Sequence, residues 1–142
     1  MVAKQLSVFI ENRQGRLGEV LDVLKTNGVN IISLSLADTT EYGLLRLIVS
    51  DPSLGKEKLA EDGFSTMLTD VLVLKINHEA GILQGLLKIL SNNNVNIEYM
   101  YGLSIDGDEA SVVLKASDLA KADAVLTANG VKTLTCEDIL SL

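Results

Sequence analysis

The 142-residue sequence is poor in the residue types that build most catalytic and metal sites. It contains one cysteine, one histidine and no tryptophan, and aromatic residues make up 4% of the chain. The only cysteine, Cys136, can form no disulfide within the chain, and we interpret it as a buried packing residue of a final strand. No cluster of cysteine, histidine or carboxylate residues has metal-ligand spacing, so we expect neither a metal nor a cofactor.

Positive charge is also scarce. Twelve lysine and arginine residues stand against nineteen acidic ones, which gives a net charge of −7. This balance disfavours the phosphate backbone of a nucleic acid and an anionic membrane surface as partners. No apolar run approaches the roughly 20 residues that span a bilayer, and residues 1–5 lack the apolar segment of a signal peptide. We therefore expect a cytoplasmic protein.

Hydrophobic residues, in contrast, are abundant. They make up 47% of the chain, and the mean hydropathy is +0.29. This content is sufficient for a packed core and argues against disorder. It is high for a small chain, so we expect part of the apolar surface to be buried between subunits.

An internal repeat organises the sequence. A shift of 66 residues aligns identical residues at ten positions between Leu6 and Ile31, where chance would give about one or two. The pairs are Leu6/Leu72, Ile10/Ile76, Gly15/Gly81, Leu17/Leu83, Leu21/Leu87, Leu24/Leu90, Asn27/Asn93, Val29/Val95, Asn30/Asn96 and Ile31/Ile97. The repeat predicts two domains, residues 1–69 and residues 70–142.

Each copy shows the periodicity of strand, helix, strand, strand, helix and strand. In the first copy we predict a strand at 6–11, a helix ending at Asn27-Gly28, strands at 29–38 and 44–49 joined by a turn at 39–43, a helix from 51 to about 63, and a strand at 64–68. In the second we predict a strand at 71–77, a helix over 82–90, strands at 95–104 and 109–116, a helix at 117–128 and a strand at 131–136. Gly63 and Gly130 are 67 residues apart, which places one extra residue in the last helix.

This order predicts an α+β fold of two tandem βαββαβ ferredoxin-like units. Each unit is an antiparallel sheet in the order 4-1-3-2 with both helices on one face. The second strand of each copy lies at an edge, and we expect the two units to join side by side through these edges. Leu44 to Val49 is apolar on both faces apart from Arg46, and Val71, Val73 and Val113 belong to similarly two-sided strands. We expect the exposed sheet face to be covered in a homodimer or larger assembly.

The segment with most functional information is Glu11-Asn12-Arg13-Gln14-Gly15-Arg16-Leu17, between the first strand and the first helix. A helix N-terminus presents free N–H groups and partial positive charge, which suit a carboxylate. Gly15 allows a ligand to approach the backbone. The alternative interpretation is that Asn12 caps the helix and Gly15 permits the turn.

This loop, followed by Gly28-Val29-Asn30-Ile31 at the start of the next strand, resembles the ACT domain. It is most similar to the serine-sensing regulatory domain of phosphoglycerate dehydrogenase, whose loop reads Glu-Asn-Arg-Pro-Gly. The resemblance covers both copies. It implies that an effector amino acid binds between two units, held by the loop of one and the strand start of its neighbour.

On this resemblance the candidate ligand-binding residues fall into two matching sets, and the second set has a histidine where the first has Asn12. They are Asn12, Arg13, Gln14, Gly15, Arg16, Leu17 and Asn30 in the first copy, and His78, Glu79, Ala80, Gly81, Ile82, Leu83 and Asn96 in the second. The proline of the serine sensor is Gln14 and Ala80 here, so the bound amino acid stays open. Tyr99 and Tyr101 could wall a pocket, although ordinary edge-strand packing accounts for them better.

Three other functions are alternatives to that of a sensor. An enzyme is not expected, because the sequence shows no nucleophile–base pair and no phosphate-binding glycine motif. The acid pairs Glu137-Asp138 and Asp106/Asp108 lie at a terminus and in a turn, where solvated charge explains them. An RNA-binding domain of the same topology would need aromatic residues on its central strands, where this chain has only Phe9. A structural module that dimerises and docks on a metabolic enzyme stays open. We expect a non-catalytic regulatory protein that binds an amino acid effector.

Overall fold

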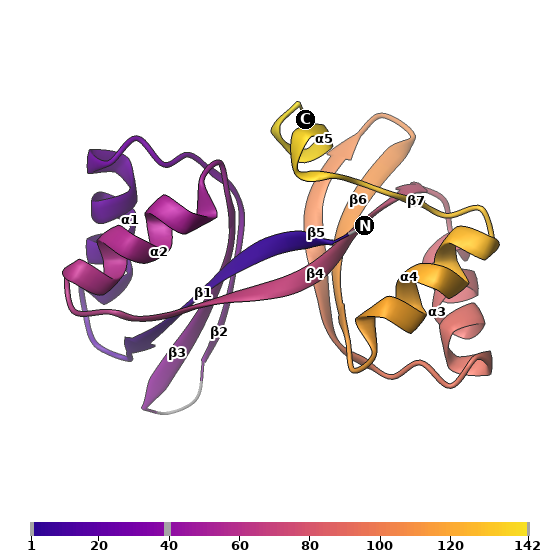
Figure 1. The fold of residues 1–142 in the computed structure, drawn as a ribbon, viewed down its shortest axis with the longest axis horizontal. Helices are drawn as coiled ribbons and strands as arrows, with labels where there is room; N and C mark the ends of the chain where they lie inside the picture. The colour runs from indigo at the N-terminus through magenta and orange to yellow at the C-terminus, as the bar shows by residue number, and fades with distance from the viewer. Residues whose placement is uncertain (1, 39–40, 142) are drawn as a thin grey trace. The chain divides into compact units, whose positions relative to one another are not determined.

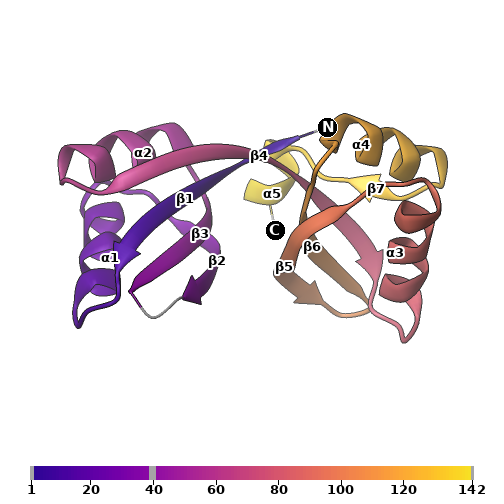
Figure 2. The same cartoon turned by 90° about the horizontal axis from the view of Figure 1, so that it is seen from below.

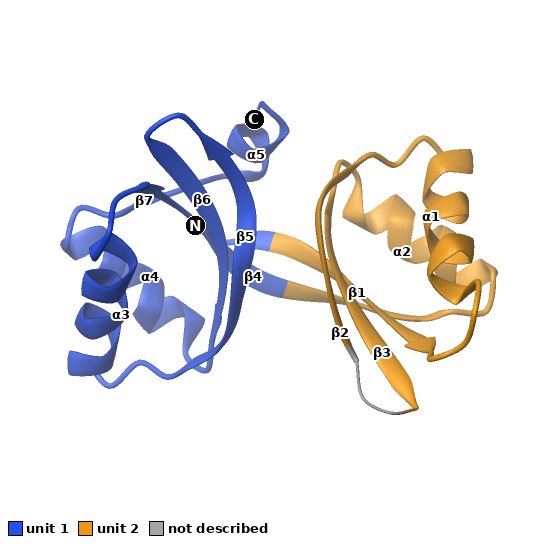
Figure 3. Ribbon diagram, turned by 180° about the vertical axis from the view of Figure 1, so that it is seen from behind, with its two compact units in different colours: residues 1–3, 70–142 blue, residues 4–69 orange. Residues whose placement is uncertain are grey.

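The computed structural model describes residues 2–38 and 41–141 and forms two compact units. One comprises residues 4–69 and the other residues 70–142 with residues 1–3 (Figure 3). The turn predicted at 39–43 lies partly outside the described residues. The elements, labelled in Figure 1, are β1 (Ala3–Glu11), α1 (Arg16–Thr26), β2 (Ile31–Asp38), β3 (Tyr42–Val49), α2 (Pro52–Glu61), β4 (Ser65–Asn77), α3 (Ile82–Asn92), β5 (Ile97–Asp106), β6 (Glu109–Ala116), α4 (Leu119–Ala128), β7 (Lys132–Thr133) and α5 (Cys136–Leu140).

The strand order confirms the predicted topology. Within residues 4–69 the order is β4-β1-β3-β2, and within residues 70–142 it is β7-β4-β6-β5. Both are the 4-1-3-2 order of a βαββαβ unit. β4 belongs to both sheets: its 13 residues form the last strand of the first copy and continue as the first strand of the second. The fold is α+β, with two tandem ferredoxin-like units.

In each unit a pair of helices, α1 and α2 or α3 and α4, lies against one face of the sheet (Figure 2), and each unit has a separate hydrophobic core. Leu6 of β1, Leu24 of α1 and Leu59 of α2 are fully buried in the first core. Their counterparts Leu72, Leu90 and Leu126 are fully buried in the second. The apolar stripes seen in the sequence are therefore the faces that the helices pack on the sheet.

The ends of the helices follow local signals in the sequence. After α1 the chain turns through Gly28 with φ 70°, as Asn27-Gly28 predicted, and after α3 Asn94 takes φ 59°. α2 is capped by Asp51, whose Oδ1 accepts from the Leu54 N–H at 3.1 Å. α4 is capped in the same way by Asp118. The two copies therefore share their helix-capping chemistry as well as their topology.

The predicted final strand at 131–136 is wrong in its second half. β7 is only two residues long, and the chain then turns into α5. Thr135 and Asp138 form a capping box, in which each side chain accepts from the other residue's backbone N–H. This reciprocal pair favours a helix start over a continued strand. Cys136 lies in the first turn of α5 and is exposed, so its interpretation as a buried strand residue is also wrong.

The extra residue of the second copy lies in β5 and not in the last helix. α2 and α4 both have ten residues, and their N-caps Asp51 and Asp118 are already 67 positions apart. β2 pairs with β3 with one irregularity, whereas β5 pairs with β6 with two, the second between Gly102 and Ser104. A bulge therefore absorbs the inserted residue at a sheet edge, where an unpaired residue disturbs few hydrogen bonds.

The three valines used to predict an exposed sheet face are fully buried. The C-terminal segment that the sequence analysis took for a strand runs along β4, where the Leu134 N–H donates to the Val73 carbonyl at 2.7 Å. Leu134 and Ile139 of this segment are themselves buried. The argument from these valines for a second subunit fails. Apolar exposure remains at Phe9 and Tyr42, and the homodimer stays a prediction.

β2 and β5 are the outermost strands of their own sheets, as predicted. β2 is paired with β3, and β5 with β6. The side-by-side joining of the units through these two edges stays a prediction.

Candidate functional site

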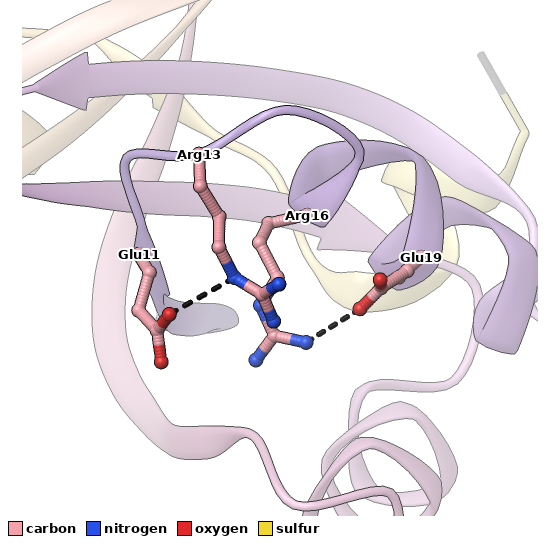
Figure 4. Close-up of polar contacts among 4 residues, drawn as sticks. All are labelled: Glu11, Arg13, Arg16 and Glu19. Atoms are coloured by element: carbon pink, nitrogen blue, oxygen red, sulfur yellow. Dashed lines mark hydrogen bonds and ion pairs between the residues drawn. The ribbon is translucent and has the colours of Figure 1, made fainter.

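Two arginine–glutamate ion pairs lie at the loop between β1 and α1 and the start of α1, as Figure 4 shows. Arg13 Nε lies 3.0 Å from Glu11 Oε2, and Arg16 pairs with Glu19 one turn into the helix. The Arg16 guanidinium also lies over the Phe64 ring, 4.2 Å from its centroid. Among the described residues, Arg16 Nε is buried without a hydrogen-bond partner. The Arg16 guanidinium thus interacts with the Glu19 carboxylate and the Phe64 ring, whereas the side chains of Arg13 and Glu11 are exposed to solvent.

Gly15, rather than Asn12, is the N-cap residue of α1. Gly15 has φ 89° and no side chain caps the helix. The backbone N–H of Asn12 instead donates to the Glu41 carbonyl at 3.0 Å. The interpretation of Asn12 as a conventional helix cap is therefore wrong, because the chain reaches the helix through a left-handed glycine three residues later.

The loop between β4 and α3 repeats this backbone with different side chains. Gly81 is the N-cap with φ 87°, again without a side-chain cap. The His78 N–H donates to the Asp108 carbonyl, as Asn12 does to Glu41. Glu79 and Ile82 replace Arg13 and Arg16, so the second loop carries no arginine. Both helices thus open with backbone N–H groups and partial positive charge facing a loop that glycine makes accessible.

Asn30 and Asn96 directly precede the second strand of their units, and each is hydrogen-bonded to a serine that directly follows the third strand. The Asn30 N–H donates to Ser50 Oγ at 2.8 Å, and Asn96 Nδ2 donates to Ser117 Oγ at 3.1 Å. The backbone carbonyls of both asparagines accept from the same serines, at 2.9 and 3.0 Å. Sequence analysis missed these serines, although each directly precedes the aspartate that caps the following helix.

Within one unit the structure does not bring the loop and the strand start together. Asn12 precedes α1 and Asn30 follows it, and α1 has 11 residues. At about 1.5 Å per residue the helix alone separates the two ends by roughly 16 Å. Asn96 is separated from His78 in the same way by the 11 residues of α3. A ligand held by both residue types would therefore need two units.

A cavity of about 630 Å³ lies beside the second loop, entirely within residues 70–142. Of the predicted site residues, His78, Glu79 and Leu83 line it, whereas Asn96 and the two tyrosines do not. Most of its wall is apolar: Ile76, Leu83, Leu103, Ile105, Ala110 and Val112. The contributions of β5 and β6 were missed by sequence analysis. The sequence held one signal of this cavity: at the repeat shift of 66 residues, Leu36 of the first copy is replaced by Gly102 in the second.

Two ionisable groups outside the loops have displaced pKa values. A hydrogen bond from Lys75 Nζ to the Glu109 carboxylate, 2.7 Å away, raises the pKa of the lysine. The Thr135 N–H lowers the pKa of the Asp138 carboxyl. In the described part of the chain no three side chains of His, Cys, Asp or Glu lie close enough to hold a metal ion. No helix of the described residues is long and apolar enough to cross a membrane.

Comparison with known proteins gives one family and several solved structures. The family profile described as an ACT domain pair matches residues 1–142. A protein from Bacteroides thetaiotaomicron of known crystal structure is 39% identical, with 100% of this chain and 98% of that chain covered and a TM-score of 0.94. The ligand-free regulatory subunit of aspartate kinase from Thermus thermophilus is 17% identical, with 92% and 95% covered and a TM-score of 0.65. The corresponding subunit from Thermus flavus is also 17% identical, with 89% and 95% covered and a TM-score of 0.60. The search of curated proteins gives no match.

Proposed function

The chain belongs to the ACT domain pair family, and on this premise we propose that it is a non-catalytic regulatory protein that binds an amino acid. The observation that carries the proposal is the duplicated loop. Gly15 and Gly81 give both helices the same left-handed N-cap with no side chain in the capping position. Such a helix start can accept a carboxylate on its N–H groups, since no protein oxygen of a cap competes for it.

The asparagines at the strand starts supply the second half of the proposed site. Their side chains can accept a hydrogen bond from an ammonium group or donate one to a carboxylate. Because helix length separates loop and strand start within a unit, we place each ligand between the loop of one unit and the strand start of another. Asn12 would then work with Asn96, and His78 with Asn30. A ligand in this position strengthens contact between units, which is how binding becomes a regulatory signal.

The fold likeness to regulatory subunits of aspartate kinase supports a role in control rather than catalysis. The partner we propose is a metabolic enzyme whose activity responds to the bound amino acid. The alternative is a docking module without a small-molecule ligand, which the exposed Phe9 and Tyr42, on neighbouring strands β1 and β3, would serve.

A thermal-shift screen with the twenty amino acids at millimolar concentration tests the proposal. A ligand at 100 times its dissociation constant adds about 2.7 kcal/mol to the stability of the folded state. We expect at least one amino acid to raise the melting temperature. If none does, the docking module becomes the better explanation.

Substitution then tests the assigned residues by calorimetry with the amino acid found. Asn12→Ala and Asn96→Ala should each weaken binding by at least tenfold with the fold intact. Asn92→Ala, an exposed asparagine at the end of α3, is the matched control and should bind as the parent chain does. Ser117→Ala removes the hydroxyl that accepts from Asn96 but leaves the Asn96 side chain in place. This variant therefore distinguishes the loss of the orientation of Asn96 from the loss of its contact with the ligand. Unchanged affinity in both asparagine variants removes these residues from the site.

A further inference from the structure

The cavity of the second unit exists because one leucine of the first copy is a glycine in the second. In the first unit Leu36 of β2 is paired with Leu45 of β3, and in the second Gly102 of β5 is paired with Val112 of β6. Leu45 and Val112 are both the fourth residue of their strand. Gly102 therefore occupies the position of Leu36.

In the first unit a leucine side chain occupies part of the space at this position. A Cβ atom added at Gly43 would lie 3.1 Å from Ile10 Cγ1 and 3.2 Å from Leu36 Cδ1. The side chain of Leu36 therefore lies over Gly43 and covers this corner of the sheet, with 46% of its own surface exposed.

In the second unit the same space is open. Ala110 stands at the position of Gly43, and a Cβ atom added at Gly102 would have no atom within 4 Å. The side chain that covers the corner in the first unit is missing, and the bulge between Gly102 and Ser104 further displaces the edge strand. The resulting cavity of about 630 Å³ is within the range of about 300–1,000 Å³ that small-molecule sites occupy.

The lining of this cavity combines aliphatic side chains with ionisable and polar ones. Ile76, Leu83 and Val112 give the wall aliphatic surface, which takes up an apolar group and releases its water. Glu79 and His78 also line the cavity. Leu83 belongs to the first turn of α3, so the wall adjoins the helix start to which we assign a carboxylate. The Glu79 carboxylate suits an ammonium group.

We infer that this cavity receives the side chain of the effector, and that the effector is an amino acid with a large apolar side chain. The inference rests on the proposed function and names its ligand class. Among the described residues the specificity pocket lies in the second copy, and in the first copy Leu36 stands where the pocket has Gly102. The two loops are therefore not equivalent binding sites.

Isothermal titration of the full chain with leucine, isoleucine, methionine, phenylalanine, alanine, serine, aspartate and lysine tests the ligand class. Affinity should rise by roughly fourfold for each added methylene. Leucine should therefore bind at least tenfold more tightly than alanine. Serine, aspartate and lysine should bind more weakly than leucine.

Gly102→Leu restores the side chain of the first copy and should weaken leucine binding by at least tenfold. Gly102 has no positive φ and open space around it, so the substitution is compatible with the strand. Gly85→Leu is the matched control: it makes the same change in α3, also into open space, at a residue that does not line the cavity. It should bind leucine as the parent chain does, and the melting temperature of both variants without ligand checks the fold.

Two results overturn the inference by different routes. If a small or polar amino acid binds most tightly, or if Gly102→Leu and Gly85→Leu bind alike, the cavity is not the specificity pocket, while the proposed function stands. If none of the twenty amino acids binds, the proposed function itself fails and the ligand assignment falls with it.

Discussion

The two copies of the repeat keep the same backbone and differ in what their side chains do at the loop. Gly15 and Gly81 have φ values of 89° and 87°, and α1 and α3 are both 11 residues long. Yet the first loop carries two arginines paired with glutamates, whereas the second carries a histidine and a glutamate beside an open cavity. The comparison teaches that the duplicated fold constrains glycines, caps and core leucines, while the site-forming side chains are free to diverge.

The largest effect is expected from the equivalent core leucines. Leu24→Ala and Leu90→Ala each leave a cavity at a fully buried position, and each should cost about 2–5 kcal/mol of unfolding free energy. Hydrogen exchange of the amides in each unit measures which core is loosened. Leu140→Ala, at a leucine that is 55% exposed, is the control and should change stability by less than about 0.5 kcal/mol. A large loss in only one core variant would break the equivalence of the two cores.

Substitution of either glycine N-cap, Gly15 or Gly81, should lower the stability by similar amounts, which are smaller than those expected for the core leucines. Alanine at Gly15 or Gly81 must adopt a left-handed conformation, which costs about 1–2 kcal/mol for a residue with a Cβ. Urea denaturation measures the change. Gly18→Ala and Gly85→Ala are controls with ordinary helical backbone and open space, and these should stabilise the chain by roughly 0.4–1 kcal/mol. A neutral result at Gly15 or Gly81 would mean that the loop relaxes out of the left-handed region.

The N-caps of the second helices give a third comparison. Asp51→Ala and Asp118→Ala each remove an acceptor for one backbone N–H, at 3.1 and 3.0 Å respectively. Each should lower the unfolding free energy by about 1 kcal/mol. Asp22→Ala, an exposed aspartate within α1, is the control. A clearly unequal loss at the two caps would show that the helices depend on capping to different degrees.

The smallest expected effect concerns α5, the C-terminal helix of the second unit. In the first unit the last strand, β4, continues directly into the second unit, so no helix follows it at the corresponding place. Hydrogen bonding to Thr135 lowers the pKa of Asp138 below its usual value of 3.8. A lowered folded-state pKa gives stability that is present above 3.8 and is lost as the pH falls through the folded value. Amide NMR signals of α5 should therefore change below about pH 4. In Asp138→Asn the change should be absent, and its persistence would assign the titration to another group.

Much of the fold could be predicted because its signals are local or repeated. The spacing of Leu17, Val20 and Leu24 fixes a helical face, and Asn27-Gly28 ends the helix where the pattern stops. The extra residue could not be placed, because Gly63 and Gly130 report its presence but not its position. The last strand was mispredicted because residues 131–136 are rich in β-branched residues, while the capping box of Thr135 and Asp138 determines the structure.

The candidate site was only half visible in the sequence. The two loops were found from their repeated glycine and helix start, and the family match over residues 1–142 agrees with that resemblance. The role of Gly102 was missed: comparison with Leu36 shows that a side chain is absent from the strand, but not which space that absence leaves open. Ser50 and Ser117 were missed for a similar reason: they contact residues 20 and 21 positions away.

By itself the sequence determined the duplicated βαββαβ order, the separate cores and the glycine-initiated helices, since periodicity and φ preference act over a few residues. Only the tertiary structure decided that Leu36 covers a corner which Gly102 leaves open, and that a bulge in β5 absorbs the inserted residue. These features arise where strands distant in the chain meet. A cavity is defined by the atoms that surround it, and those atoms come together only in the folded chain.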